Sequence, residues 1–276
     1  MTELHGAHVL VTGGSSGIGL ALARGLAARG AVLTLLARDR ARLDAAADDV
    51  VGASPAATVG VAPADVTDPP VLRSAIDAAV EARGPVDVVV TSAGAAHPGY
   101  FERLDDAVFR DQMELDYFGT LHTLRAVVPS MIRRRGGHVV AVASTAALVG
   151  VFGYSAYAPA KFAVRGLVET LRSELAPHGI VVACAYPPDT DTLGRARENE
   201  QKPVETAGIS AAIRPRSAET VAAAIVRGIE RNRLVITADV QTAALARAAG
   251  IVAPYVRWST DRTVRRVRGA GGTVEP

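Results

Sequence analysis

The sequence predicts a single α/β domain in which helices cover both faces of a parallel sheet of about seven strands. Aliphatic residues dominate the hydrophobic fraction of 49%, and only 4% of the residues are aromatic, a composition typical of buried parallel strands and their covering helices. Short apolar runs alternate with helical segments along the chain of 276 residues. Because crossovers between parallel strands are right-handed, this order indicates a doubly wound, three-layer sandwich.

Apolar runs bounded by Gly, Asp or Pro are the predicted strands. They cover residues 8–12, 32–37, 59–63, 86–91, 138–144, 180–185 and 234–237. The clearest helix starts after Asp68, has prolines in its first turn and ends before Gly84, and another is predicted over residues 218–230. The polar, proline-rich stretch 187–215 is predicted to be a long, irregular and mobile excursion of the kind that forms lids.

Charge, cysteine and histidine usage exclude several classes of protein. The 30 Lys and Arg against 28 Asp and Glu leave a net charge of +2, too little for a nucleic-acid partner. Cys184 is the only cysteine, so a reducing compartment is expected. The histidines lack partners at ligand spacing, so no metal is expected. With neither a leader-like N-terminus nor an apolar run long enough to span a bilayer, a cytoplasmic protein is predicted.

A glycine-rich turn directly follows the first apolar run and precedes a helical stretch. Its glycines allow a tight turn and close approach of the backbone to a pyrophosphate, and the helix N-terminus offers unpaired N–H groups. Isolated glycines are usually only turn formers, but the position after the first strand favours a dinucleotide site and a Rossmann-type fold. The residues predicted to bind the cofactor here are Gly13, Ser15, Ser16, Gly17, Ile18 and Gly19.

The end of the second run indicates which dinucleotide binds. A site for NAD usually has an acidic residue there, whereas this chain has Ala37 and Arg38. Ala37 leaves room, and the guanidinium of Arg38 can pair with a 2′-phosphate, so the prediction is NADPH/NADP+. The alternative is that Arg38 is a solvated surface cation. At the end of the third run, Asp65 and Val66 are predicted to hold the adenine edge.

Tyr157 and Lys161 are candidates for acid–base chemistry. At positions i and i+4 they share a helix face, so the ammonium favours phenolate and is expected to lower a phenol pKa that is about 10 in isolation. Ser144, at the end of the fifth run, is placed to donate a hydrogen bond to the substrate oxygen while Tyr157 transfers its proton. Tyrosine and lysine at this spacing also occur as ordinary surface pairs.

Together with the glycine turn and Ala93-Gly94 after the fourth run, these residues make the chain resemble the short-chain dehydrogenase/reductase family over residues 6–240. By this resemblance Ser144, Tyr157 and Lys161 match the catalytic serine, tyrosine and lysine, and Lys161 also holds the nicotinamide ribose. The resemblance further implies a homodimer or homotetramer built on the helices that carry Asp116 and Tyr157. The other residues it assigns to the cofactor are Ala93, Gly94, Pro187, Thr190 and Thr192.

Within that family the sequence most resembles the 3-ketodihydrosphingosine (3-dehydrosphinganine) reductases. The segments that carry this likeness are residues 150–154, 161–167, 185–192, 198–199, 202–203, 205–206 and 209–210. The resemblance implies NADPH-dependent reduction of the 3-keto group of a long-chain lipid precursor to a secondary alcohol. The alternatives are a reductase or dehydrogenase for another ketone (3-ketoacyl, steroid or secondary metabolite) and a non-catalytic NADPH-binding regulator.

Two positions depart from the family pattern. Asp116 stands where the family usually has an asparagine whose backbone carbonyl helps to hold a water near the catalytic lysine. We expect that the backbone does this work and that Asp116 is tolerated; alternatively its carboxylate approaches Lys161 and holds that lysine charged. Thr91-Ser92 replaces another asparagine, and a hydroxyl there is expected to tie the strand to neighbouring backbone.

The last part of the chain is predicted to be an extension of the catalytic domain. We place the NADP(H)-binding and catalytic domain at residues 1–240 and an amphipathic, basic extension at residues 241–276. Apolar residues at helical spacing over 243–255 are followed by Trp258 and several arginines. Such a segment either makes peripheral contact with anionic lipid or packs on the domain or a partner subunit.

Overall fold

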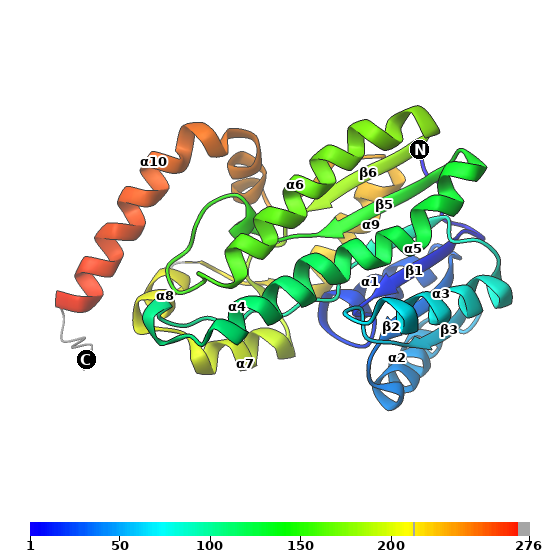
Figure 1. Cartoon of the computed structure of the whole chain (residues 1–276), viewed down its shortest axis with the longest axis horizontal. Helices are drawn as coiled ribbons and strands as arrows, with labels where there is room; N and C mark the ends of the chain where they lie inside the picture. Colours follow the sequence, from blue (N-terminus) through cyan, green and yellow to red (C-terminus); the bar gives the residue numbers. More distant parts are fainter. Residues whose placement is uncertain (212, 270–276) are drawn as a thin grey trace.

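The computed structural model describes residues 1–211 and 213–269, so residue 212 of the predicted excursion and residues 270–276 of the predicted extension lie outside the described part. A seven-stranded parallel sheet forms its centre, in the order β3-β2-β1-β4-β5-β6-β9 (Figure 1). This confirms the predicted α/β class. The strands of the sheet are β1 (His8–Thr12), β2 (Val32–Ala37), β3 (Thr58–Pro63), β4 (Val88–Thr91), β5 (Gly137–Val142), β6 (Ile180–Ala185) and β9 (Val235–Ile236).

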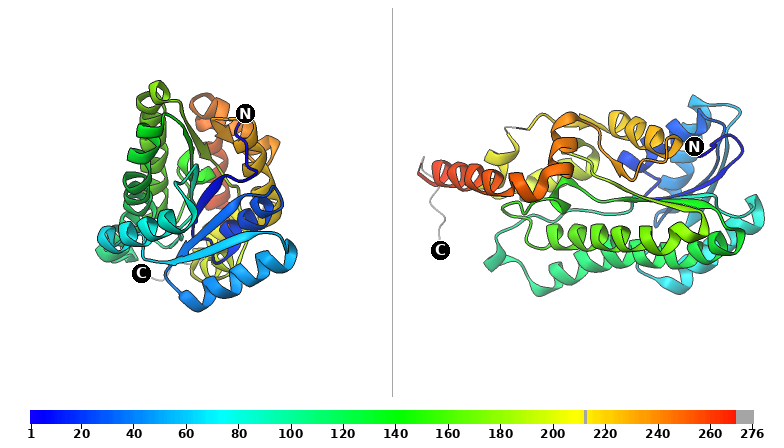
Figure 2. Two further views of the ribbon diagram at one scale, coloured as in Figure 1. Left: turned by 90° about the vertical axis from the view of Figure 1, so that its right-hand side faces the viewer. Right: turned by 90° about the horizontal axis from the view of Figure 1, so that it is seen from above.

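Helices cover both faces of this sheet and complete the predicted three layers (Figure 2). Buried side chains of α1, α2 and α9 pack on one face, and those of α3, α5 and α6 pack on the other. The helices are α1 (Gly17–Ala27), α2 (Arg40–Ala53), α3 (Pro69–Arg83), α4 (Asp106–Gln112), α5 (Gly119–Arg134), α6 (Tyr157–Leu175), α7 (Leu193–Gln201), α8 (Val204–Ser210), α9 (Ala218–Glu230) and α10 (Val240–Gly269).

The sequence dictates these elements by local physical rules. In β1, Val9 and Val11 point into one core and Leu10 into the other, because successive side chains of a strand face opposite sides. At the start of α3 the Asp68 carboxylate accepts a hydrogen bond from Val71 N, as its predicted cap. The sheet is therefore buried on both sides, with its carboxyl edge left for a ligand.

Some predicted boundaries differ from the structure by one or two residues. The fourth strand begins at Val88, two residues later than predicted, and the seventh is shorter than predicted. The fifth strand ends at Val142 instead of residue 144, because Ser144 leaves the ladder and its Oγ accepts a hydrogen bond from Ala146 N in a 3-10 turn. This early end exposes Ser144 at the carboxyl edge of the sheet.

The prediction of an irregular excursion over 187–215 is wrong, because this segment contains α7 and α8. Thr192 caps α7 by accepting a hydrogen bond from Arg195 N, and a two-residue ladder pairs β7 (Thr190–Asp191) with β8 (Arg216–Ser217). None of the α7 residues is buried, so the sequence lacks the apolar periodicity by which helices are recognised. The helices α7 and α8 therefore form part of the wall of the cavity described below.

The predicted boundary after residue 240 falls at the start of α10, a helix that changes direction at Ala248 and extends away from the sheet (Figure 1). Before this kink, Leu245 packs on the core of the domain. Beyond it the helix packs on α8, so closely that a β-carbon on Gly208 would lie 2.8 Å from Val267 Cγ2. The extension is thus joined to the fold at both ends of its described length.

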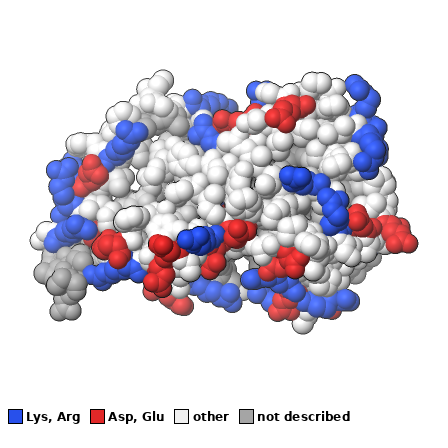
Figure 3. Space-filling model, in the orientation of Figure 1, with Lys and Arg blue, Asp and Glu red and all other residues white. Residues whose placement is uncertain are grey.

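Surface charge is mixed. On the face shown in Figure 3, basic and acidic side chains are interspersed, in line with the net charge of +2. No helix in the described part of the chain is both long enough and apolar enough to cross a membrane.

Candidate active site

A cavity of about 1000 Å³ runs along the carboxyl edge of the sheet. It opens where β1 is flanked by β2 on one side and β4 on the other, the switch point at which doubly wound sheets bind ligands. Apart from Asp116, every residue predicted for the site lines this cavity: Gly13, Ser15, Ser16, Gly17, Ile18, Gly19, Arg38, Asp65, Val66, Ala93, Gly94, Ser144, Tyr157, Lys161, Pro187, Thr190 and Thr192.

The glycine turn between β1 and α1 has the geometry expected of a phosphate cradle. Gly13 has φ +68°, and a β-carbon there would lie 2.9 Å from the backbone of Ala93. At Gly19 a β-carbon would overlap the carbonyl oxygen of Gly13. Ser16 precedes α1 in extended backbone and makes no side-chain cap, so the first N–H groups of the helix keep their capacity for an anion.

Arg38, directly after β2, and Asp65, shortly after β3, lie next to each other at the rim of the cavity. Arg38 Nη1 is 3.8 Å from Asp65 Oδ2, and the Arg38 side chain is 75% exposed. Asp65 Oδ1 accepts hydrogen bonds from Thr67 N and Thr67 Oγ1, which fix its orientation. The guanidinium is therefore placed beside the cavity with most of its donors in solvent.

Ala93-Gly94 forms the opposite wall of the crevice after β4. Thr12 Oγ1 accepts hydrogen bonds from Ser92 N and Ala93 N, each at 3.1 Å, and so ties β1 to this segment. The prediction that a hydroxyl of Thr91 or Ser92 makes this connection is wrong. The hydroxyl belongs to Thr12, and the segment after β4 contributes backbone N–H groups. The Thr91 hydroxyl is buried without a hydrogen-bond partner among the described residues.

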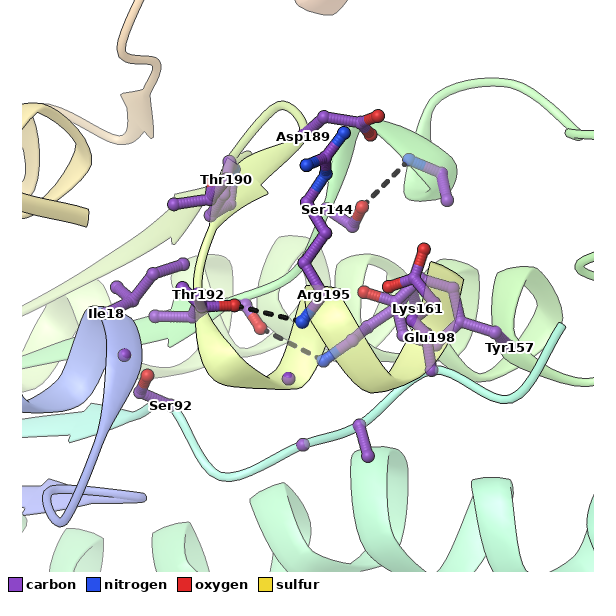
Figure 4. Close-up of a pocket in the computed structure, with 18 of the residues that line it drawn as sticks. Ile18, Ser92, Ser144, Tyr157, Lys161, Asp189, Thr190, Thr192, Arg195 and Glu198 are labelled. Carbon is purple, nitrogen blue, oxygen red and sulfur yellow. Dashed lines mark hydrogen bonds between the residues drawn. The ribbon is translucent and has the colours of Figure 1, made fainter. Parts of the chain in front are cut away.

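Ser144, Tyr157 and Lys161 meet in one part of the cavity (Figure 4). Ser144 follows β5, whereas Tyr157 and Lys161 occupy the first turns of α6. Lys161 Nζ lies 5.6 Å from the centroid of the Tyr157 ring and donates a hydrogen bond to Val142 O at 3.3 Å. The sheet and one helix thus bring together a hydroxyl, a phenol and an ammonium that are separate in the sequence.

The Tyr157 phenol does not have the lowered pKa that the sequence predicts. Burial raises the pKa of Tyr157, while the Lys161 charge and a hydrogen bond with Ser144 lower it only in part. The carboxylates of Asp116 and Glu198 also raise this pKa. The prediction considered only the charge of Lys161. Burial of the phenol and the negative charges of Asp116 and Glu198 outweigh that charge, so the pKa of Tyr157 is raised.

Asp116 contacts Lys161 through its carboxylate, so the expectation that its backbone alone acts is wrong. Asp116 is fully buried, and its Oδ1 lies 3.2 Å from Lys161 Nζ. A β-carbon on Gly94 would overlap this carboxylate, so glycine is needed there. Although burial lowers the pKa of Lys161, the Asp116 carboxylate and Tyr157 raise it above its ordinary value. Asp116 therefore holds Lys161 as an ammonium from behind the cavity.

A π-helical segment and a hydrogen bond from Gln112 position the Asp116 carboxylate next to Lys161. Residues Met113–Phe118 form a π-helical segment between α4 and α5, a feature frequent at functional sites. Gln112 Nε2 donates hydrogen bonds to Asp116 Oδ2 and to Ala95 O, both at 2.9 Å. The sequence analysis missed Gln112, although its position four residues before Asp116 on one helix face could have indicated the contact.

The segment after β6 closes the cofactor half of the cavity. Thr145 N donates a hydrogen bond to Pro187 O, and Thr190 Oγ1 donates to Pro188 O. Thr192 lies against the glycine turn, since a β-carbon on Gly17 would be 3.3 Å from Thr192 Cγ2. The two predicted threonines are therefore placed against the cavity, one of them beside the phosphate cradle.

Two further residues of the cavity wall escaped the site prediction. The ring of Tyr154 contacts that of Tyr157 in a tilted arrangement, with centroids 5.7 Å apart and planes inclined at 53°. Its hydroxyl donates a short hydrogen bond to Glu198 of α7. Over residues 1–211 and 213–269, no group of three or more His, Cys, Asp and Glu side chains is arranged to hold a metal ion.

Residues 7–203 match the short chain dehydrogenase family. The chain belongs to this family. Among known proteins, this short-chain dehydrogenase is 43% identical over 228 residues to "3-dehydrosphinganine reductase" of Danio rerio, covering 82% of this chain and 69% of the relative. It is 42% identical over 256 residues to "3-ketodihydrosphingosine reductase" of Dictyostelium discoideum, covering 87% of this chain and 77% of the relative. The predicted likeness to this group of reductases is confirmed.

One solved structure shares the fold along nearly the whole chain. A short-chain dehydrogenase from Sphingobium yanoikuyae in complex with NADPH superposes with a TM-score of 0.75 at 26% identity, covering 98% of each chain. This short-chain dehydrogenase therefore shares its seven-stranded, doubly wound sheet with a protein whose structure was solved with NADPH bound.

Proposed function

We propose that this protein is an NADPH-dependent reductase that converts the 3-keto group of a long-chain lipid precursor, such as 3-ketodihydrosphingosine, into a secondary alcohol. One observation carries the proposal: Ser144, Tyr157 and Lys161 line one cavity together with a glycine turn and an exposed arginine at its rim. The names of its relatives support the substrate. The cation at Arg38 supports the choice of NADPH over NADH.

The residues present fit a nicotinamide dinucleotide. The cradle at Gly13 and Gly19 leaves no room for side chains, and its helix N-terminus would hold the pyrophosphate. Arg38 would hold the 2′-phosphate, and Lys161 the nicotinamide ribose. When bound, this cofactor supplies the hydride that reduces the carbonyl carbon.

The chain's own residues supply the proton and stabilise charge. Ser144 donates a hydrogen bond to the carbonyl oxygen, which develops negative charge during reduction. Tyr157 donates its proton to the same oxygen, and the Lys161 ammonium stabilises the phenolate that remains. Because burial raises the pKa of Tyr157, the phenol keeps its proton at neutral pH and is ready to act as an acid. This is the protonation state that reduction of a carbonyl requires.

Oxidation of NADPH and of NADH, followed by the absorbance of the reduced nicotinamide, tests the proposal. The substrate is 3-ketodihydrosphingosine in detergent, and Tyr157→Phe is the control. We expect turnover with NADPH that falls by about 100- to 10,000-fold in the variant, with NADPH binding retained. Binding without turnover of this ketone, but with turnover of another in a panel, would reassign the substrate. Binding without turnover of any ketone would favour a regulator.

We further propose that the protein acts in the cytoplasm as a homodimer or homotetramer. The family membership supports the subunit pairing, as does Phe162, which is 41% exposed on α6. Light scattering after gel filtration would measure the assembly. We expect Phe162→Glu to shift it towards monomer, whereas a monomeric wild-type chain would contradict the proposal.

A further inference from the structure

We propose that Glu198 binds a protonated amine of the substrate, so that the cavity selects a ketone with an amino group on the adjacent carbon. This inference rests on the proposed reductase function and deepens it. It concerns a carboxylate that α7 places in the wall of the cavity, on the side that covers Tyr157. Figure 4 shows Glu198 on α7 among the residues that line the cavity with Tyr157.

The Glu198 carboxylate is held in place by two neighbours. The Tyr154 hydroxyl donates a hydrogen bond to Glu198 Oε1, and Lys202 Nζ lies 2.8 Å from the same oxygen. The Lys202 side chain is only 3% exposed, so it supports the carboxylate from within the cover. Both contacts fall on Oε1, which leaves Oε2 with its acceptor capacity. The carboxylate is therefore oriented in advance and retains an oxygen for a ligand.

This carboxylate lies close to the reacting groups. Tyr154 connects Glu198 to Tyr157 through a ring contact of 5.7 Å between centroids. Glu198 is also one of the groups whose negative charge raises the pKa of Tyr157. A cation bound at Glu198 would offset this charge and ease release of the Tyr157 proton. The position thus couples recognition of a cation to the proton transfer.

The chemistry of 3-ketodihydrosphingosine fits this arrangement. Its amine is protonated in neutral water and stands on the carbon next to the ketone. With the ketone oxygen at Ser144 and Tyr157, the ammonium is confined to the part of the cavity around that oxygen, and Glu198 lines the same cavity near enough for its charge to act on Tyr157. Charge-assisted hydrogen bonds are about twice as strong as neutral ones, and a site built for a donor strongly rejects the analogue that lacks it.

Asp189 provides a second acidic group on the same wall. It lines the cavity, and its Oδ2 is buried without a hydrogen-bond partner among the described residues. Burial raises the pKa of Asp189, while the charges of Lys202 and Arg195 lower it in part. The wall therefore combines two carboxylates with the cations Lys202 and Arg195, and Glu198 is the carboxylate linked to Tyr157.

Steady-state kinetics with two ketones test the inference. One is 3-ketodihydrosphingosine, and the other is the same chain with hydrogen in place of the amine. We expect Glu198→Gln to lower kcat/KM for the amino ketone by about 10- to 100-fold and to change that for the other ketone by less than about threefold. Glu198→Asp, which keeps the charge, should keep a preference for the amino ketone. An equal loss with both ketones, or no loss, would overturn the inference.

The matched control is Glu200→Gln, which removes an exposed carboxylate from the same helix outside the lining of the cavity. We expect it to leave both ketones unaffected. Thermal melting of each variant separates loss of the site from loss of the fold.

A binding measurement distinguishes failure of this inference from failure of the proposed function. Calorimetry compares the long-chain amino alcohol with its analogue lacking the amine, in wild type and Glu198→Gln. If the wild type binds the amino alcohol more tightly than the analogue, and Glu198→Gln does not, the amine site is supported, even if no ketone is reduced. Equal binding of the two alcohols by wild type overturns the amine site, even if ketones are reduced.

Discussion

At the residue scale, the candidate chemistry depends on how charge is distributed around Lys161. The lysine is nearly buried, with one carboxylate, Asp116, 3.2 Å from its ammonium and the ring of Tyr157 on another side. A buried cation without a partner is costly, whereas a paired one is retained. Asp116 therefore secures the charge of Lys161, at the cost of adding negative charge near Tyr157.

Asp116→Asn tests this distribution through the pH profile. Asp116 raises the pKa of Tyr157, so its neutralisation should lower that pKa. Oxidation of the alcohol needs the phenolate, so in the variant it is expected to begin at a lower pH than in the wild type. Reduction needs the phenol and is lost as the pH rises, and this loss should also occur at a lower pH in the variant. The measurement is kcat against pH in both directions.

Glu114→Gln is the matched control, since it removes an exposed carboxylate from the same π-helical segment. Its profile should coincide with that of the wild type. An Asp116→Asn profile that stays in place, or moves to higher pH, contradicts the electrostatic role of Asp116.

Arg38 is the residue that selects the cofactor in this account. Arg38→Ala is expected to weaken NADPH binding by about 10- to 100-fold, the loss typical of a hydrogen-bonded charged contact, and to leave NADH binding nearly unchanged. Fluorescence titration measures both affinities. Arg40→Ala, which removes a neighbouring arginine paired with Asp44, serves as control. Equal losses for the two cofactors would show that Arg38 does not read the phosphate.

The sequence predicted the identity of the site residues better than their electrostatics. Ser144, Tyr157 and Lys161 could be found because strand ends and helix spacing bring them together. The direction of the Tyr157 pKa and the contact of Asp116 could not be found in this way. Both depend on burial and on side-chain directions, which are set by the packing of α5 and α6 on the sheet.

At the element scale, the cover of the cavity is fastened at one buried carboxylate. Glu205 in α8 is fully buried; its Oε1 accepts a hydrogen bond from Arg268 Nε at 2.8 Å and its Oε2 accepts one from Tyr100 Oη at 2.9 Å. These contacts join α8, the end of α10 and the loop after β4. They explain how helices with little buried surface of their own stay in place over the site.

Glu205→Gln should loosen this fastening. Although burial raises the pKa of Glu205, the hydrogen bonds from Arg268 and Tyr100 lower it below its ordinary value. The contribution is therefore present at neutral pH and is lost as the pH falls through the lowered pKa. The protection of α8 and the end of α10 against hydrogen exchange, taken relative to the intrinsic amide rate at each pH, should be lower in the variant, and in the wild type it should fall at acid pH.

A matched variant is Asp105→Asn, which removes an exposed carboxylate at the end of the same loop whose side chain makes no cap. It should exchange as the wild type does. If Glu205→Gln did not change the exchange of either helix, Glu205 would not be the fastening point.

The elements of the core could be predicted, whereas the cover could not. Strands at 8–12, 32–37 and 180–185 have the predicted bounds, because both faces of each are buried and their apolar runs are continuous. In contrast, α7 is polar on all sides and depends on the Thr192 cap and on contacts with distant segments. Such contacts leave no periodic signal in the sequence.

At the scale of the whole molecule, α10 presents two different faces. Val256 and Thr260 line the cavity, so the helix contributes to the site. On the other face, Ile251, Tyr255 and Trp258 are 84%, 68% and 52% exposed, and their spacing puts them in one stripe. An exposed stripe of apolar and aromatic side chains beside arginines is typical of contact with an anionic lipid surface.

We predict that the protein floats with anionic vesicles at low salt and that Trp258→Ser with Tyr255→Ser weakens this association. Because the arginines contribute electrostatic attraction, added salt should also weaken it. Val51→Ser, which removes an exposed apolar side chain from α2, is the control. If the wild-type protein stayed in the soluble fraction, the prediction of lipid contact would be wrong, and contact of this stripe with another protein would be the alternative.

The most direct test of the central claim follows the transferred hydrogen itself. The protein is supplied with 3-ketodihydrosphingosine and with NADPH in which both hydrogens on the reactive carbon of the nicotinamide are deuterium, and the lipid product is analysed by mass spectrometry. We predict one deuterium on the carbon that bore the ketone, and about 100- to 10,000-fold slower formation of this product with Tyr157→Phe. Wild-type protein that binds both compounds but gives no deuterated alcohol would contradict the account.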